Sequence, residues 1–213
     1  MAKVAPPVDL FAWAKDADVD LGPAFEALQR LYDEIERKNA ALTQNLNLPC
    51  HRGCSMCCHE SVFLTPLEFF YVWHYVQTHL TDQERQGIIE DGLKLYEEHR
   101  TQILALEEPL TGAQQDHFDV ASRLRFACPM LSAAGACRVY PAREMLARLF
   151  GCSFNDAGGL YACHIVADHI GDQTVTLLRA RPTWRRLLDL PLTHKRQVYP
   201  YYIHLLFGGA STA

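Results

Sequence analysis

Apolar and polar residues alternate at helical spacing over the first long stretch of the chain, Pro23 to Leu46. The apolar residues fall on one face and the charged residues on the other. Proline is favoured in the first turn of a helix, so Pro23 suits a helix start. The pattern predicts an amphipathic helix over residues 23–46, with an apolar face formed by Phe25, Leu28, Leu31, Ile35 and Leu42.

Two capping boxes indicate where the next helices begin. Residues 65–68 read Thr-Pro-Leu-Glu, with proline at the first helical position, and predict a helix that ends near His79. Residues 81–84 read Thr-Asp-Gln-Glu and predict a long helix that ends near Leu106, before Pro109. The first of these helices is rich in aromatic residues, which are expected to pack into the core.

Short extended segments and turns dominate the second half of the chain. Residues 128–140 contain two extended pieces around a glycine, which predicts a small hairpin. Residues 155–159 form a second predicted turn, and residues 173–180 have strand character. A short helix is predicted over residues 142–150, with Gly151 as its C-terminal cap.

Two stretches are expected to lie outside the packed core. Residues 1–22 are rich in Ala, Asp and Pro and predict a loosely held arm. Phe11, Trp13 and Leu21 can pin this arm to the body. Residues 107–120 are polar and predict a linker on the surface.

These elements predict a mainly α-helical, irregular α+β domain with small β-hairpins, organised around a cysteine-rich metal site. The chain divides into an N-terminal arm and helix at 1–48, a cysteine-cluster domain at 49–180, and a C-terminal extension at 181–213 packed on or beside it. A chain of 213 residues is long enough to bury a proper core.

The composition is that of an ordinary globular protein and disfavours several functional classes. Hydrophobic residues make up 49% of the chain and charged residues 21%, and the formal net charge is -5. A net negative charge disfavours a general nucleic-acid binder. The N-terminus lacks an apolar signal region, and the apolar run at 201–207 is too short to span a bilayer. We therefore expect a cytoplasmic protein that binds no nucleic acid and no membrane. A protein partner or substrate stays open.

The chemistry of the chain is concentrated in its eight cysteines. In a reducing compartment, this many cysteines indicate metal ligation rather than a disulfide framework. Thiolates spaced Cys-x3-Cys-x2-Cys can face one centre, and the rest of the site is expected downstream. The predicted metal ligands are Cys50, Cys54, Cys57, Cys58, Cys128, Cys137, Cys152 and Cys163.

Two questions about these ligands stay open at this point. Cys57 and Cys58 are adjacent, so their side chains would diverge in extended geometry. They are expected either to serve two neighbouring centres or to have different roles. Four-thiolate sites suit both zinc and iron–sulfur clusters, so the predicted cofactor is an iron–sulfur cluster or zinc.

The cysteine spacing resembles that of a known family. The pattern consists of Cys50-x3-Cys54-x2-Cys57-Cys58, then Cys128-Pro129-x-Leu131, then Cys137-x-Val139-Tyr140-x-x-Arg143. Over residues 49–163 this resembles the YkgJ-like cysteine-cluster family, described as zinc- or iron-chelating proteins with a CxxxCxxCC motif. The resemblance implies metal or cluster binding. Relatives of the domain occur in a flagellin lysine methylase, which points to redox or protein-modification chemistry.

The chain departs from this family pattern in one segment. The family continues Arg-Pro-x-x-Cys-Arg, whereas residues 143–148 here read Arg-Glu-Met-Leu-Ala-Arg. Glu144 therefore stands at the proline position and Ala147 at the cysteine position. Cys152 matches a later family position, and Cys163 can compensate for the missing ligand.

Two other functions remain open. A zinc site closed by four cysteines can staple a structural or interaction module that has no catalytic role. The Cys-x3-Cys-x2-Cys spacing also matches radical S-adenosylmethionine enzymes. Those enzymes alternate strands and helices, whereas the residues after Cys58 predict helices. The sequence alone does not decide whether the protein is an enzyme.

Three histidines adjoin the cysteines. His51, His59 and His164 can each replace a thiolate ligand. A histidine next to a ligand more often faces solvent or supports that ligand through a hydrogen bond. The cysteines therefore remain the predicted ligands.

Several other polar residues lie near the cysteines or in the tail. Arg143 lies on the family pattern and is expected to offset thiolate charge or to hold a substrate carboxylate. Arg52 and Arg138 are expected to be solvated or to form structural ion pairs. Tyr140 is expected to pack. A solvated basic face is expected from Arg185, Arg186, Lys195 and Arg196.

Overall fold

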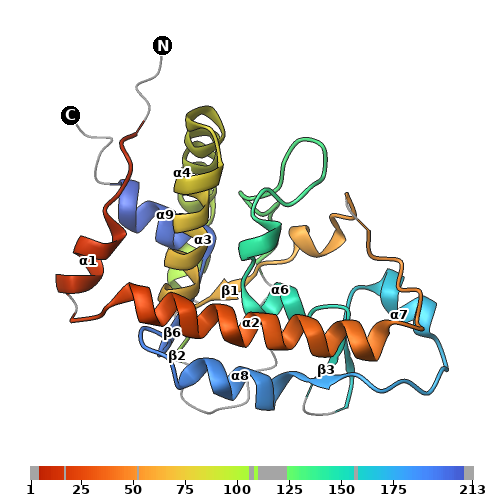
Figure 1. Cartoon of the computed structure of the whole chain (residues 1–213). Coiled ribbons are helices and arrows are strands. Elements are labelled where there is room, and N and C mark those ends of the chain that lie inside the picture. The colour runs from red at the N-terminus through yellow and green to blue at the C-terminus, as the bar shows by residue number, and fades with distance from the viewer. Residues whose placement is uncertain are drawn as a thin grey trace.

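The structure is a computed structural model that describes residues 5–16, 18–51, 53–105, 108–109, 124–155 and 158–208. It is mainly helical, with a few short strands (Figure 1). The helices are α1 (Leu10–Asp16), α2 (Leu21–Thr43), η1 (Met56–His59), α3 (Pro66–His79), α4 (Asp82–Ala105), η2 (Tyr140–Ala142), α6 (Met145–Leu149), α7 (His164–Ile170), α8 (Ala180–Leu188) and α9 (Tyr199–Phe207). The strands are β1 (Phe63–Leu64), β2 (Glu108–Pro109), β3 (Ser153–Phe154), β4 (Leu160–Tyr161), β5 (Leu178–Arg179) and β6 (Lys195–Val198).

Helix α2 crosses the molecule and has different neighbours at its two ends (Figure 1). It begins after Asp20, whose side chain accepts a hydrogen bond from the Gly22 backbone N–H at 3.0 Å. Pro23 lies in its first turn, as predicted. The predicted helix at 23–46 is therefore confirmed, with both ends displaced towards the N-terminus.

The N-terminal arm forms a packed helix. Within α1, Leu10 and Ala14 are buried, and Trp13 packs edge-on against Phe70 of α3 with ring centroids 4.8 Å apart. The prediction of a loosely held arm is wrong for these residues. Only two of the seven residues of α1 are buried, which is too few to produce a periodic apolar pattern.

Both predicted capping boxes are present. The Thr65 hydroxyl accepts a hydrogen bond from the Glu68 N–H at 3.3 Å, and the Glu68 carboxylate accepts one from the Thr65 N–H at 2.9 Å. Thr81 and Glu84 make the same two bonds, at 3.3 Å and 3.0 Å. Helices α3 and α4 therefore begin where the sequence predicted.

An aromatic core lies between α3 and α9. Phe69 of α3 stacks on Tyr202 of α9 with centroids 4.9 Å apart, and Trp73 contacts Phe207 at 5.1 Å. Tyr202 also donates a hydrogen bond to the Leu64 carbonyl at 3.1 Å. The C-terminal helix is thus part of the core, and the aromatic residues of α3 pack there as predicted.

The strands of the described chain form two small sheets. Strand β6 lies between β1 and β2 and is antiparallel to both. In the second sheet, β3 lies between antiparallel β4 and parallel β5. The β3–β4 turn is closed by a hydrogen bond from the Asn155 N–H to the Gly159 carbonyl at 2.8 Å, which confirms the predicted turn for its described residues. Of the strand predicted at 173–180, only the two residues of β5 form a strand.

The cysteine-bearing segments gather towards the end of α2 that lies away from α1 (Figure 1). The predicted hairpin at 128–140 is a tight turn with a single β-bridge between Leu131 and Cys137. The helix predicted at 142–150 splits into η2 and α6, because Arg143 between them has an extended backbone (φ -55°, ψ 148°). Gly151 follows α6 with φ 86°, a conformation that favours glycine.

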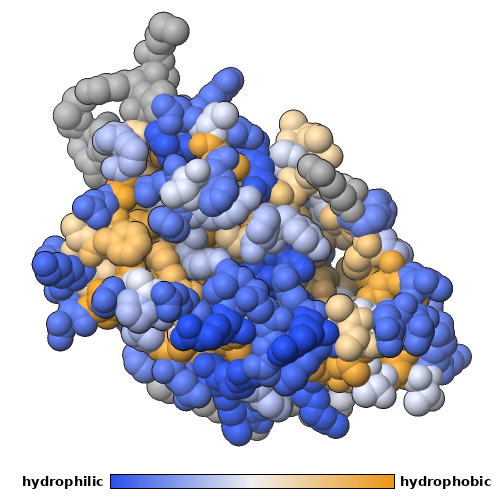
Figure 2. Space-filling model, in the orientation of Figure 1, coloured by the Kyte–Doolittle hydropathy of each residue, from blue (hydrophilic) through white to orange (hydrophobic). Residues whose placement is uncertain are grey.

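The surface is mixed in polarity. Figure 2 shows hydrophilic residues over much of the face that α2 crosses, with apolar patches towards its two sides. Every helix in the described parts of the chain is too short or too polar to cross a lipid bilayer. The predicted linker at 107–120 falls outside the described residues, apart from the two residues of β2.

Candidate functional site

All eight cysteines lie in the described residues, and all have free thiols. They form two neighbouring groups. The first, termed the hairpin cluster, consists of Cys57, Cys58, Cys128 and Cys137. The second, termed the α7 cluster, consists of Cys50, Cys54 and Cys163, with Cys152 beside it. The two groups adjoin, since Cys57 of the hairpin cluster also interacts electrostatically with Cys50.

A backbone hydrogen bond assembles the hairpin cluster from two distant parts of the sequence. The Cys128 N–H donates to the Cys58 carbonyl at 2.7 Å. The bridge between Leu131 and Cys137 then folds the second strand of the hairpin back towards this contact. One cysteine from η1 and two from the hairpin are thereby brought together.

Cys57 and Cys58 share one 3-10 helix, η1, instead of an extended segment. The Cys58 thiol donates a hydrogen bond to Cys57, which lowers the pKa of Cys57 to about 7 and raises that of Cys58 far above its usual value. Cys57 is therefore the member of the pair that ionises. The expectation that the two side chains diverge is wrong, because it assumed extended geometry.

Burial keeps the other two thiols of the hairpin cluster protonated. It raises the pKa of Cys128 above its ordinary range and that of Cys137 to about 11, and the nearby Glu144 carboxylate adds to both effects. Glu144 is only 3% exposed and accepts a hydrogen bond from the Tyr199 hydroxyl. The Glu144 carboxylate interacts with Cys57, Cys128 and Cys137 and opposes the thiolate form of each, so a bound cation would be needed to ionise the whole set.

The α7 cluster joins the first cysteine loop to the start of α7. The Gly151 N–H donates to the Tyr161 carbonyl at 2.7 Å, close to Cys163, which is the N-cap residue of α7. Gly151 also faces Cys50, since a Cβ at this position would lie 3.8 Å from Cys50 Sγ. Cys50 is exposed as a residue, but partial burial of its sulfur raises its pKa, as do the neighbouring thiols of Cys54 and Cys163.

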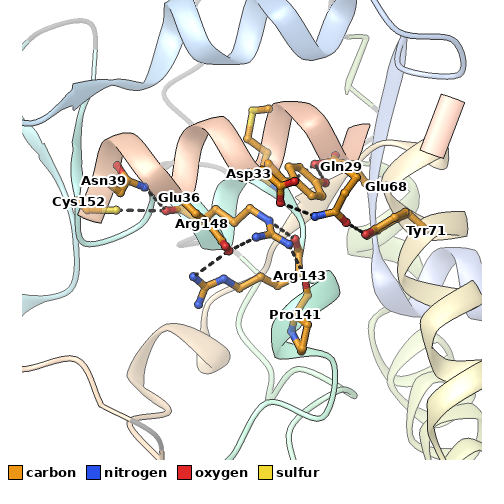
Figure 3. Close-up of polar contacts among 12 residues, drawn as sticks. Gln29, Asp33, Glu36, Asn39, Glu68, Tyr71, Pro141, Arg143, Arg148 and Cys152 are labelled. Carbon is orange, nitrogen blue, oxygen red and sulfur yellow. Dashed lines mark hydrogen bonds and ion pairs between the residues drawn. The ribbon is translucent and has the colours of Figure 1, made fainter. Parts of the chain in front are cut away.

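Cys152 directs its thiol to the end of α6. Its Sγ donates to the carbonyls of Arg148 and Leu149 at 3.2 Å and 3.5 Å (Figure 3). Burial raises its pKa to about 12. In this structure the Cys152 thiol therefore satisfies helix carbonyls, although Cys50 lies near it.

Arg143 is the cation shared by the two clusters. Burial disfavours the thiolate forms of Cys50 and Cys152 in one cluster and of Cys137 in the other, and the charge of Arg143 favours all three. It also favours the thiolate form of Cys57. The position of Arg143 is consistent with its expected role of offsetting thiolate charge.

Two side chains hold the Arg143 guanidinium from outside the clusters. It lies 4.0 Å above the Tyr140 ring. It also lies 3.9 Å from the Glu36 carboxylate (Figure 3). Tyr140 itself is 57% exposed, so the packing expected of it is a contact on the surface and not in the interior. Its ring instead provides an aromatic surface for Arg143.

A buried arginine that sequence reasoning missed connects α6 to α2. Arg148 is 2% exposed and bonds to Glu36 and to the carbonyls of Arg143 and Pro141, each carbonyl at 2.7 Å (Figure 3). Its guanidinium also lies 4.1 Å above the Tyr32 ring. No local pattern identifies such a residue, because an arginine in a short helix is typical of the surface.

A buried glutamate makes a second connection. Glu68 accepts hydrogen bonds from the Tyr32 hydroxyl at 2.9 Å, the Met145 N–H at 2.8 Å, and the Thr65 N–H and hydroxyl at 2.9 Å and 3.0 Å. It thereby joins α2, the start of α3 and the start of α6. The capping box identified Glu68, but its bonds to the other two elements depend on tertiary structure.

The histidines beside the cysteines are all on the surface. His51, His59 and His164 are exposed. Arg52 lies outside the described residues. Arg138 is partly buried, and its Nη1 has no hydrogen-bond partner among the described residues, so the solvated alternative is wrong for this atom.

The basic tail is only partly a solvated face. Arg186 forms a bidentate ion pair with Glu34 of α2, with both N–O distances 2.7 Å. Arg196 is 3% exposed and lies 5.1 Å above the Trp184 ring, so the predicted solvation is wrong for this residue. The other two predicted basic residues are exposed.

The donor atoms suit a thiophilic metal by type but are not yet arranged around one. Within the described residues, no three Cys, His, Asp or Glu side chains form a group that could hold a metal ion as they stand. Sulfur donors from several loops are nonetheless the ligand set that zinc and iron–sulfur clusters prefer. Binding would therefore require movements that bring thiols together around the metal.

No protein-family model, curated protein or solved structure matches this chain. The resemblance to the YkgJ-like family therefore stays a prediction from the cysteine spacing. The function has to be argued from the two clusters themselves.

Proposed function

We propose that this protein binds a thiophilic metal through its cysteines, as an iron–sulfur cluster or as thiolate-bound zinc. The observation that supports the proposal is the meeting of three separate segments, residues 50–58, 128–137 and 152–163, with all of their thiols free. A core built only for stability has no need to collect reduced cysteines in this way. Thiolate ligation gives these residues a shared role.

The residues around the clusters have supporting roles in this proposal. The cysteines supply thiolates, and Arg143 offsets part of their negative charge. Arg148 and Glu68 hold α6 against α2 and α3, which positions the segment between Cys137 and Cys152. Redox or protein-modification chemistry would require a redox-active cluster or an open coordination position.

The helical surroundings disfavour the radical S-adenosylmethionine alternative. The two long elements that follow Cys58 are α3 and α4, two consecutive helices. Those enzymes place their cluster in a barrel of alternating strands and helices. The shared cysteine spacing is therefore better explained by a helical metal-binding protein.

Metal and sulfide analysis of protein purified without air tests this proposal directly. A brown protein with iron and acid-labile sulfide identifies an iron–sulfur cluster, whereas a colourless protein with stoichiometric zinc identifies a zinc site. A protein that binds neither metal, after purification or after anaerobic reconstitution, overturns the proposal.

Substitution of one cysteine from each cluster provides a second test. Cys54→Ser and Cys137→Ser are expected to lower metal content, because each removes a thiolate donor. Met56→Ala is a suitable control, since Met56 lies in η1 between these cysteines and is 40% exposed. Full metal content and stability in both cysteine variants would contradict a metal site shared between the first cysteine loop and the hairpin.

A further inference from the structure

A cavity of about 350 Å³ lies between α2 and the segment that contains the end of α8. Helix α8 runs beside α2 (Figure 1), and Figure 2 shows small apolar areas among strongly hydrophilic residues along this line. The cavity is lined by Ala27, Arg30, Leu31 and Glu34 of α2 and by Arg186 and Leu190. Its volume lies at the lower end of the range for small-molecule sites. It can therefore hold a small organic molecule.

One part of the cavity lining is apolar. Ala27 and Leu31 are four residues apart on α2, so they lie on the same face of the helix. Leu190 lines the same cavity from beyond the end of α8. The burial of apolar surface against such a lining is favourable. The lining therefore favours a ligand with an apolar body.

The other part of the lining carries two guanidinium groups from different helices. Arg186 of α8 is held in place by Glu34, to which it donates two hydrogen bonds of 2.7 Å. Arginine has further N–H donors beyond these two bonds, which can bind a second acceptor. Arg30 of α2 has a side chain that is 69% exposed and lies 3.6 Å from the Glu26 carboxylate. Two such groups at one cavity favour a carboxylate or a phosphate, which can accept hydrogen bonds from both.

The charges around the cavity also favour an anion. The Glu34 carboxylate is paired with Lys38 as well as with Arg186, at 2.7 Å, so two cations offset its charge. Residues 173–188 contain four arginines and no acidic residue, although the whole chain has a net charge of -5. A local concentration of positive charge draws anions towards this surface.

We propose that the cavity between α2 and α8 binds a small organic anion that has an apolar body and one carboxylate or phosphate group. The apolar body lies against Ala27, Leu31 and Leu190. The anionic group accepts hydrogen bonds from Arg30 and Arg186. The proposal involves none of the cysteines and is independent of the proposed metal binding.

Titration of the full chain with four probes, followed by NMR, tests the two requirements of this site. Phenyl phosphate and phenylacetate have both an aromatic ring and an anionic group, whereas 2-phenylethanol has no charge and inorganic phosphate has no apolar body. The two aromatic anions are expected to bind with a Kd in the millimolar range, as suits ligands of this size. The other two probes should bind at least about tenfold more weakly. Tighter binding of phenyl phosphate identifies phosphate as the preferred group, and the reverse order identifies carboxylate.

Five variants locate the binding site. Ala27→Phe fills the cavity and keeps every charge, so it should abolish binding of phenyl phosphate. Arg30→Ala and Arg186→Ala should each weaken binding about tenfold, because each removes a charged hydrogen-bond donor. Arg37→Ala on α2 and Arg185→Ala on α8 are the matched controls, since both residues are exposed and lie outside the cavity lining. The controls should change the Kd by less than about twofold, because solvent and salt screen exposed charges.

Three outcomes would overturn the proposal. Equal losses of affinity in Arg185→Ala and Arg186→Ala, or inorganic phosphate that binds as tightly as phenyl phosphate, would show only a general attraction of anions to the basic surface. Binding of 2-phenylethanol as tight as that of phenyl phosphate would show that the cavity does not recognise an anion. Unchanged binding of phenyl phosphate by folded Ala27→Phe would place the ligand elsewhere.

The arginine variants protect the test against misfolding. Arg30 and Arg186 have exposed side chains, so their replacement is expected to leave the fold intact, as circular dichroism can verify. If Ala27→Phe does not fold, the comparison of Arg30→Ala and Arg186→Ala with their matched controls still decides whether the cavity binds the anion.

Discussion

The two ends of α2 are stabilised in different ways (Figure 1). At one end, α1, α3, α4 and α9 form a helical half, in which long helices share an apolar cluster with aromatic residues from α3 and α9. At the other end, residues 49–60 and 128–179 form a cysteine half made of short elements. The cysteine half contributes Met130, Val139, Met145 and Leu149 to this same apolar cluster, and its own separate cluster has only three buried members, Val166, Ile170 and Leu177.

This difference indicates where a metal is needed. Apolar burial is the main source of folding stability, and a region with a small apolar cluster usually needs additional cross-links. The cysteine half contains all eight cysteines and no disulfide. The helical half should therefore fold through its own packing, whereas the cysteine half should depend on bound metal and on its buried apolar and polar contacts with the helical half.

The largest expected effect is that of metal removal. We expect a chelator, under reducing conditions, to lower the free energy of unfolding by on the order of 5 kcal/mol, because metal binding cross-links segments that are far apart in the sequence. Limited proteolysis with mass spectrometry should show early cleavage within 128–138 and 151–163. The helices of the helical half should be cleaved later.

A matched control separates metal removal from general destabilisation. In the control, urea is added to metal-loaded protein until the free energy of unfolding falls by the same amount. The first cleavages should then not be concentrated in the cysteine half. A melting temperature that the chelator leaves unchanged would contradict the dependence of the cysteine half on metal.

The next largest effect is expected at Glu68. Glu68→Ala should lower the free energy of unfolding by about 3 kcal/mol, because it leaves the buried Tyr32 hydroxyl and the N–H groups of Thr65 and Met145 without their acceptor. Urea unfolding followed by circular dichroism measures the change. Glu84→Ala removes the same capping interaction from an exposed capping box and should cost much less. Equal losses would show that Glu68 acts only as a cap.

The contrast between these two glutamates also shows how far the sequence could predict the structure. Local signals were sufficient for the starts of α3 and α4, since each capping box lies within four residues. They could not predict that Glu68 contacts Met145, because that bond joins elements far apart in the chain.

The same limit applies to the candidate site. The spacing of the cysteines identified the predicted ligands, but their division into two clusters depends on the contact between Cys58 and Cys128. The burial of Arg148 likewise depends on Glu36 of α2. Short-range periodicity carries no information about such pairings.

Two glycines test the different packing of the two halves. A Cβ at Gly92 of α4 would overlap the Ile203 side chain of α9. Gly92→Ala should therefore lower the free energy of unfolding by about 2 kcal/mol through overpacking. Up to about 1 kcal/mol of this loss should be offset, because alanine has a higher helix propensity than glycine. Gly151→Ala should lower the free energy of unfolding by about 1–2 kcal/mol, because alanine is strained at the φ of 86° that this residue adopts. Thermal unfolding measures both changes. Only Gly151→Ala should also lower metal content, since Gly151 adjoins Cys50. Metal loss from Gly92→Ala would show that the halves are not independent.

Glu68 should also produce a pH dependence of the opposite sign to that of most carboxylates. Burial raises the pKa of Glu68 from an ordinary value of 4.5, so the folded state holds this proton more tightly than the unfolded state. Stability due to this group is therefore present at low pH and is lost as pH rises from 4.5 through the raised pKa. Over this pH rise, the free energy of unfolding of the wild type should fall relative to that of Glu68→Gln. The fall should be about 1.4 kcal/mol for each unit by which the pKa of Glu68 is raised. Urea unfolding of both proteins over a pH series gives this difference, and parallel curves would contradict it.

The smallest effect is expected at Arg186, whose ion pair connects α2 to α8 on the surface. Hydrogen bonds from Arg186 and then Lys38 lower the pKa of Glu34 to about 2. Arg186→Ala should raise that pKa towards its ordinary value, as NMR titration can measure, while thermal unfolding changes little because exposed ion pairs are weakened by solvent. Arg185→Ala, on the same helix, should leave the Glu34 titration unchanged. A large loss of stability in Arg186→Ala would mean that surface ion pairs, rather than buried Glu68 and Arg148, hold the elements around α2 together.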